Sequence, residues 1–176
     1  SDDVGALYSK YADEFGADNT TIEGNTFVDG GEIADVWFYT NSYADDTVVK
    51  DNTFSSTTGK YGVRAYDQST KRLTVFNNTF DGPETALQLI NTDGYSVGNN
   101  SITGVSDASK PGITINGGHG DVSNNTLLDA DGGIRIDSAE APPAPSTSLC
   151  SIAGNSYRSS STCTFTIPSG ATAYVD

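Results

Sequence analysis

The stretch Val75-Phe76-Asn77-Asn78-Thr79-Phe80 decides the fold of this chain, because variants of it occur six times. Each copy has an aliphatic residue, any residue, Gly/Asn/Asp, Asn, Thr/Ser and an apolar residue. The copies occupy residues 22–27, 49–54, 75–80, 97–102, 122–127 and 152–157. Their fourth residues, which lie 27, 26, 22, 25 and 30 positions apart, are Asn25, Asn52, Asn78, Asn100, Asn125 and Asn155. A repeat of this length predicts a stack of similar structural units.

The repeat itself predicts a strand, a tight corner and a second strand. Asparagine tolerates left-handed backbone angles, and its side chain bonds to neighbouring backbone groups, which suits a corner. Strands stacked in one sheet lie about 4.8 Å apart, so the amide of one corner can bond to the amide of the next. We therefore expect the six asparagines to form one hydrogen-bonded ladder.

A second repeat alternates with the first, and most of its copies have an apolar residue at every second position, as in a half-buried strand. The copies are residues 36–39, 63–66, 87–90, 113–116, 134–137 and 165–168. The side chains of this repeat that we expect in the core are Val36, Phe38, Val63, Ala65, Leu87, Leu89, Ile113, Ile115, Ile134 and Ile136. Those expected from the first repeat are Ile22, Val49, Val75, Val97 and Val122, with Phe27, Phe54 and Phe80.

These two repeats, with their asparagine corners, resemble the right-handed parallel β-helix of the pectate-lyase-like superfamily. The resemblance covers nearly the whole chain and implies an all-β solenoid of about six coils, which we expect to form a single domain over residues 1–176. It implies no particular activity, because that superfamily includes lyases, hydrolases, epimerases, viral spikes and adhesins.

Residues 1–15 fit two patterns. The spacing of Val4, Leu7 and Tyr11 fits an amphipathic capping helix. Alternatively, Asp3-Val4 matches Asp35-Val36 at an offset of 32 residues, which makes residues 4–9 a strand of an incomplete coil. We favour the strand, and on that interpretation the chain is the C-terminal part of a longer β-helix.

Two features interrupt the end of the repeat. Residues 138–149 include Ala141-Pro142-Pro143-Ala144-Pro145, which cannot continue a β ladder because proline lacks the amide donor, so we expect an excursion loop there. Cys150 and Cys163 flank the last coil. We expect them to form a disulfide in an exported protein, and two buried thiols are the alternative.

The chain is strongly acidic, with 9 Lys and Arg against 23 Asp and Glu and a net charge of −14. This charge argues against binding to nucleic acid or to anionic membranes. It also disfavours polyuronates unless Ca²⁺ bridges the charges. An acidic surface of this kind keeps a protein soluble and suits a salt-loving or marine host. No run of apolar residues is long enough to span a bilayer.

Three motifs resemble the polygalacturonase family of the same superfamily: Asn91-Thr92-Asp93, Gly118-His119-Gly120 and Gly133-Ile134-Arg135-Ile136-Asp137. In that family the equivalent motifs and an Asp-Asp pair converge on one face, where the acids flank the scissile bond. Here Asp45-Asp46 precedes the Asn-Thr-Asp motif, and an Arg-Ile-Lys motif is replaced by Arg-Ile-Asp. The first two motifs also precede strands of the other repeat, so we expect them around a corner from Arg135. The sequence therefore disfavours this hydrolase site.

The outward positions of the second repeat are the candidate ligand-binding surface. Strand alternation points them to solvent, and solenoids bind ligands on such extended faces. Aromatic rings stack on sugars while polar groups bond to hydroxyls. The residues we predict to bind a ligand are Trp37, Tyr39, Arg64, Tyr66, Gln88, Asn116, Arg135 and Asp137, with Ile90 and Thr114 on the same face. The alternative is that the aromatic residues pack under a loop or against a partner subunit.

A catalytic role of this face would resemble the polysaccharide lyases and mannuronan epimerases of similar fold. Those enzymes abstract a proton next to a carboxylate, with a base and a cation or metal that stabilises the enolate. Arg64, Tyr66 and Arg135 are groups of that kind. The epimerase signature Tyr-Gly-Phe-Asp-Pro-His is reduced to Tyr61-Gly62-Val63-Arg64, and whether the chain is an enzyme stays open.

Other motifs have simpler interpretations. We predict no dedicated metal site and no cofactor, with Ca²⁺ at Asp45-Asp46 or at Asp129 and Asp131 as the alternative, because turns contain Asp for backbone reasons. His119 is expected to be an exposed turn residue. Asn-x-Ser/Thr sequons begin at Asn19, Asn77, Asn99 and Asn124, but they follow from the composition of the corner repeat and do not by themselves imply glycosylation.

Two functions remain. The first is an extracellular or cell-surface module that binds, and in the enzyme case processes, polysaccharide through the face of the second repeat. The second is a non-catalytic structural protein of a cell surface, filament or viral fibre, in which that face contacts neighbouring subunits of a homo-oligomer.

Overall fold

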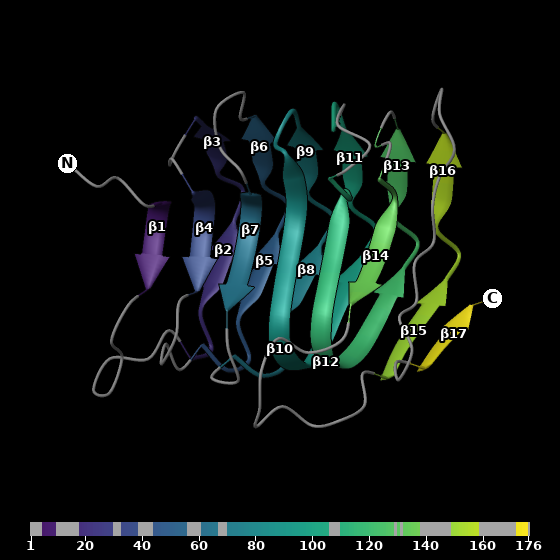
Figure 1. Cartoon of the computed structure of the whole chain (residues 1–176). Coiled ribbons are helices and arrows are strands. Elements are labelled where there is room, and N and C mark those ends of the chain that lie inside the picture. The colour runs from purple at the N-terminus through teal and green to yellow at the C-terminus, as the bar shows by residue number, and fades with distance from the viewer. Residues whose placement is uncertain are drawn as a thin grey trace.

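The computed structural model describes residues 5–9, 18–29, 33–38, 44–55, 61–66, 70–105, 110–128, 130, 132–137, 149–158 and 172–175. Within these residues the chain is built of β-strands and turns, and all of the paired strands run parallel. The strands form a solenoid in which each coil crosses three walls (Figure 1).

The three walls are named here by their place in the coil. The entry row leads into the asparagine corner and consists of β2 (Thr21–Glu23), β5 (Val48–Lys50), β8 (Thr74–Phe76), the ends of β10 (Thr85–Gly98) and β12 (Ile113–Ser123), β15 (Leu149–Ala153) and β17 (Thr172–Val175). The exit row leaves the corner and consists of β3 (Thr26–Val28), β6 (Thr53–Ser55), β9 (Thr79–Asp81), β11 (Ser101–Thr103), β13 (Thr126–Leu128) and β16 (Ser156–Arg158). The return row consists of β1 (Gly5–Ser9), β4 (Ala34–Phe38), β7 (Tyr61–Tyr66), the starts of β10 and β12, and β14 (Ile134–Asp137).

Two long strands join two of these walls. β10 and β12 run through both the return row and the entry row, so these two rows form one continuous sheet in the described residues. Each long strand bends between the rows at residues with positive φ, at Asn91 and Gly94 in β10 and at Gly117 and Gly118 in β12. The exit row is a separate sheet of six described strands, one for each copy of the asparagine repeat.

The predicted asparagine ladder is present. Each asparagine donates its Nδ2 proton to the Oδ1 atom of the asparagine in the next coil, over distances of 3.2, 3.1, 3.0, 2.9 and 2.9 Å from Asn25 through to Asn155. The same Oδ1 atoms also accept the backbone N–H of the preceding asparagine, as in Asn78 to Asn100 at 3.0 Å. The four inner members, Asn52, Asn78, Asn100 and Asn125, are almost fully buried. The ladder therefore satisfies corner backbone groups that water does not reach.

The residue before each ladder asparagine forms a second column, on the outside of the corner. Its members have φ between 53° and 68°, and they are Gly24, Asp51, Asn77, Asn99, Asn124 and Gly154. Glycine, asparagine and aspartate are the residues that adopt this left-handed conformation at low cost. This conformation explains why the third position of the repeat is restricted to these three types.

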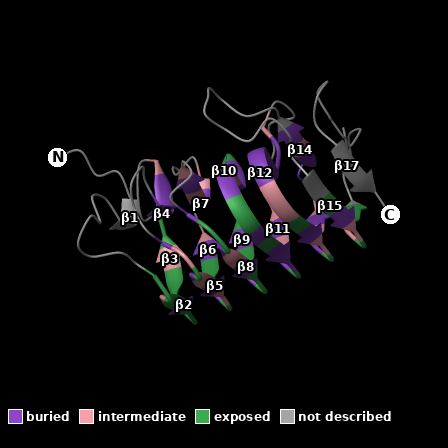
Figure 2. Cartoon of the chain, turned by 90° about the horizontal axis from the view of Figure 1, so that it is seen from below, coloured by how far each residue is buried: buried purple, intermediate pink, exposed green. Residues whose placement is uncertain are grey.

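The core lies inside the three walls, and its predicted members are confirmed. Every inward residue predicted from the second repeat is buried, as are the aliphatic residues that begin the first repeat. Phe27, Phe54 and Phe80 stack from coil to coil, with ring centroids 4.9 and 4.6 Å apart and ring planes within 6° of parallel. Figure 2 shows the buried residues alternating with exposed ones along the strands. The aromatic stack is therefore part of the core, as expected.

The N-terminal segment forms a strand, but its predicted register is wrong. β1 pairs with β4 so that Leu7 lies beside Val36 and Tyr8 beside Trp37, an offset of 29 residues instead of 32. The same register places Gly5 beside Ala34 and Ser9 beside Phe38. The match of Asp3-Val4 to Asp35-Val36 therefore does not give the pairing of the two strands.

Several predictions fall outside the described residues. They are the Pro-rich loop, the Cys163 side of the predicted disulfide, the strand at residues 165–168, and the acidic pair Asp129 and Asp131. The side chain of Cys150 is likewise outside them.

We predict that the ladder asparagines carry much of the stability. Asn100→Ala removes the acceptor for Asn78 and the donor to Asn125, and leaves buried polar groups unpaired. The expected loss is on the order of 2–4 kcal/mol in the free energy of unfolding, measured by urea denaturation. The control is Asn99→Gly, which changes the exposed neighbour at φ 53° to a residue that favours this angle. Equal losses in the two variants would contradict the assigned role of the ladder.

Candidate functional site

The outward side chains of the return row are aligned by the strand register. One column runs through Trp37, Arg64, Gln88, Thr114 and Arg135, one residue from each successive coil. A parallel column runs through Tyr66, Ile90, Asn116 and Asp137. The structure thus brings together on one wall the residues that the sequence assigned to the ligand-binding surface. Tyr39 and the side chain of Asp137 lie outside the described residues.

Arg64 is the centre of this wall. Its guanidinium carbon lies 5.5 Å from the centre of the Trp37 ring, 4.8 Å from that of Tyr61 and 5.4 Å from that of Tyr66. Its Nε atom donates to Oε1 of Gln88 at 2.8 Å. Arg64 and the two tyrosines are half-buried, so the group is held in place while part of it stays accessible. We call Arg64, Trp37, Tyr61, Tyr66 and Gln88 the Arg64 cluster.

Arg64 has no carboxylate partner among the described residues, although the chain has 23 acidic residues. Its contacts are three aromatic faces and a neutral amide oxygen. Such contacts orient a guanidinium without neutralising it. The N–H groups that do not bond to Gln88 therefore keep their capacity to donate to a ligand.

The prediction that this whole face is open to solvent is wrong. Trp37, Ile90, Thr114 and Asn116 are only 6%, 3%, 2% and 5% exposed. Strand alternation fixes the direction in which a side chain leaves the sheet, but neighbours on adjacent coils only about 4.8 Å away cover the shorter ones. Thr114 stands between Gln88 and Arg135, and one face of Trp37 is covered by Arg64. Trp37 is therefore a support for Arg64 and not an open platform for a sugar.

The candidate catalytic residues do not lie around one point. Arg64 and Tyr66 are on one coil, and Arg135 is three coils further along the stack. At about 4.8 Å for each coil, the backbones of Arg64 and Arg135 are roughly 14 Å apart. Two groups at this separation do not act on the same bond, but they do suit contacts along an extended polymer.

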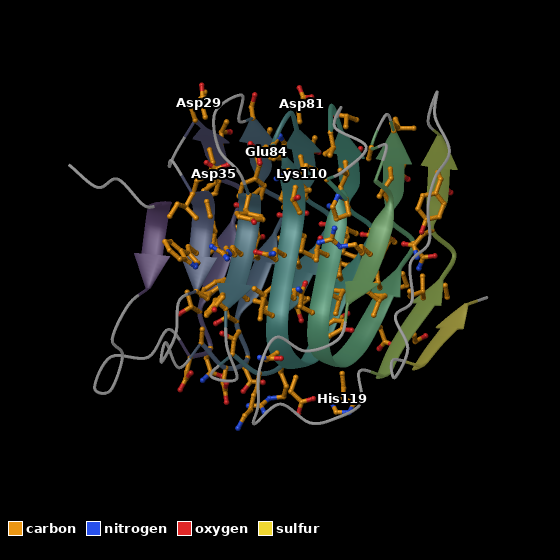
Figure 3. All side chains as sticks on the ribbon, viewed as in Figure 1. Asp29, Asp35, Asp81, Glu84, Lys110 and His119 are labelled. Atoms are coloured by element: carbon orange, nitrogen blue, oxygen red, sulfur yellow. The ribbon has the colours of Figure 1, made fainter. Side chains whose placement is uncertain are left out.

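A second set of polar side chains lines the bend between the return and entry rows. His119 Nδ1 lies 2.9 Å from Asp93 Oδ1, on the adjacent coil. The structure thus joins the Asn-Thr-Asp and Gly-His-Gly motifs, which sequence analysis did not predict to be in contact. As expected, they lie around a corner from Arg135, since Arg135 is on the return row. Figure 3 shows His119 at the edge of the molecule opposite Asp29 and Asp81 of the exit-row end.

The two glycines beside His119 are explained by the packing of the backbone. A Cβ atom at Gly118, which has φ of 87°, would lie 1.8 Å from the carbonyl oxygen of Thr92. One at Gly120 would lie 2.2 Å from the carbonyl oxygen of Tyr95. Both glycines are therefore required because adjacent coils approach closely at the bend. Backbone packing accounts for this motif without any catalytic role.

Salt bridges continue along the same bend. Arg72 Nε lies 2.6 Å from Asp46 Oδ1, and Arg72 also lies 3.5 Å from Asp45 Oδ2. The hydrogen bond from Arg72 holds the pKa of Asp46 below its ordinary value. A guanidinium therefore occupies the place where Asp45-Asp46 was considered as a Ca²⁺ ligand. Within the described ranges no three His, Cys, Asp or Glu residues are grouped closely enough to hold a metal ion.

Comparison with known proteins gives one match. The model of the family described as a right-handed β-helix region matches residues 13–102, which are 90 of the 176 residues. The match agrees with the parallel solenoid and supplies its right-handed sense, but it does not single out the pectate-lyase-like superfamily within that architecture. Neither a search of curated proteins nor a search of solved structures found a match. In the described residues there is no helix of the length and apolarity needed to cross a membrane.

We predict that Gly118 matters for folding and His119 does not. Gly118→Ala places a methyl group against the Thr92 backbone at a positive φ and should cost more than about 3 kcal/mol in the free energy of unfolding. His119→Ala removes one exposed contact and should cost less than about 1 kcal/mol. Chemical denaturation of both variants measures the difference. A tolerated Gly118→Ala variant would show that the coils are not in close contact here.

We also predict a pH-dependent contribution from Asp46. Its pKa is lowered in the folded state, so its stabilising effect is present above the pKa of the unfolded chain and disappears as the pH falls through the folded value. Asp46→Asn should lower the Tm at pH 7, and this difference should shrink and disappear as the pH falls below the ordinary aspartate pKa and through the lowered folded value. The control is Asp121→Asn, at an exposed carboxylate that has no ion pair with any described residue. A Tm difference that persisted at low pH would exclude the ion pair as its cause.

Proposed function

Since this chain belongs to the right-handed β-helix family, we propose that it is an extracellular module that binds polysaccharide along its return row. The proposed contact residues are Tyr61, Arg64, Tyr66, Gln88 and Arg135. The observation that carries the proposal is the Arg64 cluster, in which a half-buried guanidinium is held by three aromatic rings and an amide, and by no acid of the described residues.

The physical support comes first from the energetics of that arginine. A half-buried cation is normally paired, because removing it from water is costly. In a chain of net charge −14, carboxylates are abundant, yet the contacts of Arg64 within the described part of the chain are with neutral groups. A ligand that brings hydroxyl or carboxylate oxygens would complete the hydrogen bonding of this arginine.

The shape of the wall further favours a polymer. Its polar side chains recur once per coil in a straight column, and Arg135 lies roughly 14 Å from Arg64 along the stack. A small ligand cannot reach both groups, whereas several consecutive sugars can. The overall acidity favours a neutral polysaccharide, or an acidic one whose charge is bridged by Ca²⁺.

No catalytic centre is included in the proposal. A lyase or epimerase needs a base and a cation placed at the same sugar, and a step of that kind is not assigned to Arg64 and the tyrosines beside it. Binding through the return row needs no such convergence.

The alternative function is a structural protein that uses the same wall for subunit contacts. It would fill the hydrogen bonds of Arg64 with groups of a second chain. The two functions differ in what removes Arg64 from solvent, which is a glycan in the first case and a protein surface in the second.

We predict that Arg64→Ala and Tyr66→Ala each weaken polysaccharide binding by about tenfold, which is about 1.4 kcal/mol. The measurement is a glycan array that includes neutral polysaccharides, and uronates with and without Ca²⁺, followed by titration of the best ligand. The control is Tyr157→Ala, at a 37% exposed tyrosine on the exit row.

Two results would overturn this proposal. One is the absence of binding to any polysaccharide, and the other is binding that neither variant affects. Light scattering on the same samples distinguishes polysaccharide binding from the alternative function, in which the wall contacts other subunits. Self-association of the unmodified chain that is lost in Tyr66→Ala would assign the wall to subunit contacts.

A further inference from the structure

The four Asn-x-Ser/Thr sequons begin at residues that the fold places on the surface. Asn19, Asn77, Asn99 and Asn124 are all exposed, and each has φ between 53° and 56°. Their positions contrast with those of the ladder asparagines that follow three of them, which are buried. The corner thus divides each Asn-Asn pair into one structural asparagine and one that faces solvent.

The side-chain amides of the exposed asparagines are not equally engaged. Asn77 donates its Nδ2 proton to Asp51 Oδ1 at 2.5 Å. The Nδ2 groups of Asn19, Asn99 and Asn124 make no hydrogen bond to any described residue. An amide nitrogen that is exposed and not bonded is accessible to an enzyme, whereas the Asn77 amide is held by its neighbour.

The hydroxyl groups of the sequons also face outward. Ser101 and Thr126 lie on the exit row, in the column next to the buried Ile102 and Leu127. Strand alternation therefore directs their side chains to the outer surface. Thr21, which completes the sequon of Asn19, is exposed at the start of the entry row. Both groups that define a sequon are thus available at Asn19, Asn99 and Asn124.

We propose that the folded chain is an acceptor for N-linked glycan, at Asn19 and at one of the pair Asn99 and Asn124. The co-reactant is an oligosaccharide activated as a lipid-linked diphosphate, with its transferase. The Nδ2 nitrogen forms a bond to the anomeric carbon of the first sugar and loses one proton to the transferase or to water. The bond from that carbon to the diphosphate breaks, and the lipid diphosphate leaves with the electron pair.

Asn99 and Asn124 can carry only one glycan between them because adjacent coils lie close together. Asn99 and Asn124 belong to adjacent coils, whose backbones are linked at Gly98 and Ser123 by the sheet register. The two attachment points are therefore only about 4.8 Å apart along the axis. A branched glycan is bulky, so the first one attached blocks the second. Asn19 lies at the other end of the entry row and is not blocked by either.

Glycosylation in the organism rests on the proposed export of the chain, but the capacity of the folded chain to accept glycan does not. The test is therefore made in vitro on the purified, folded chain. It uses a detergent-solubilised oligosaccharyltransferase whose acceptor requirement is Asn-x-Ser/Thr alone, together with a lipid-linked oligosaccharide. Intact mass gives the number of glycans, and peptide mapping gives their positions.

The expected result is a limit of two glycans per chain, one at Asn19 and one divided between Asn99 and Asn124. Asn99→Gln should keep two glycans and move the second entirely to Asn124, while the double variant Asn99→Gln/Asn124→Gln should keep only one. Ser101→Ala and Thr126→Val remove the same sequons without changing the corner asparagines, and they should give the same counts. Asn77→Gln should change nothing.

Two outcomes would overturn the proposal. The first is a folded chain that accepts no glycan although the same chain, unfolded in urea and diluted into the reaction, accepts them. The second is a chain that carries glycans on Asn99 and Asn124 together. Failure of polysaccharide binding on the return row would not affect either outcome of the glycan-transfer test, because the acceptor sites lie on other walls and corners.

Discussion

The fold depends on a hydrogen bond between two side-chain amides, repeated from coil to coil. Each ladder asparagine donates to the oxygen of the next, and that oxygen also accepts a backbone N–H of the coil before it. The corner is buried, so these groups have no access to water and must bond to one another. The bond works only if every coil returns to the same place after one turn. The ladder therefore sets the position at which each coil meets the next, while the walls between corners vary in length.

This constraint also fixes the geometry of the surface. Residues at equivalent positions form straight columns, separated by the strand spacing of about 4.8 Å. On the return row, the column holds an arginine between aromatic rings and an amide, with a second arginine further along. At the corner, one column holds the buried ladder asparagines, and the column beside it holds exposed residues, three of which are asparagines. Function in such a chain depends on which residue types occupy a column, because the distances between them are given by the fold.

The fold was predictable from the sequence because the repeat carries its own physical explanation. The Gly/Asn/Asp position needs a left-handed backbone angle, the asparagine that follows needs a partner above and below, and the alternation of the second repeat identifies the inward residues. The register of the N-terminal strand was not predictable from identical residues, because the observed pairing lies three residues away from the match of Asp3-Val4 to Asp35-Val36. The burial of Trp37 and Asn116 was missed for another reason, since a single strand pattern does not reveal what the adjacent coils cover.

The candidate site was predictable only in part. Alternation placed Arg64, Gln88 and Arg135 on one wall, but it gave no sign of the three aromatic contacts that hold Arg64, and Tyr61 was not selected as a site residue. The contact between Asp93 and His119 was missed because it depends on the bend shared by β10 and β12. Asp93 lies seven residues before Asn100 and His119 lies six residues before Asn125, and the shift of one residue between the two coils hides the pairing from a simple count.

The central claim is that the six asparagine repeats are stacked one above another in a single column. The most direct measurement is the distance between two spin labels attached to cysteines at Thr26 and Ser156, which follow the first and last ladder asparagines, in a chain whose own cysteines are replaced by serine. Five strand spacings separate these positions, so the account predicts one narrow distribution centred at about 24 Å, broadened only by the label linkers. A broad distribution, or one centred more than about 10 Å away from this value, would show that the repeats are not stacked in register.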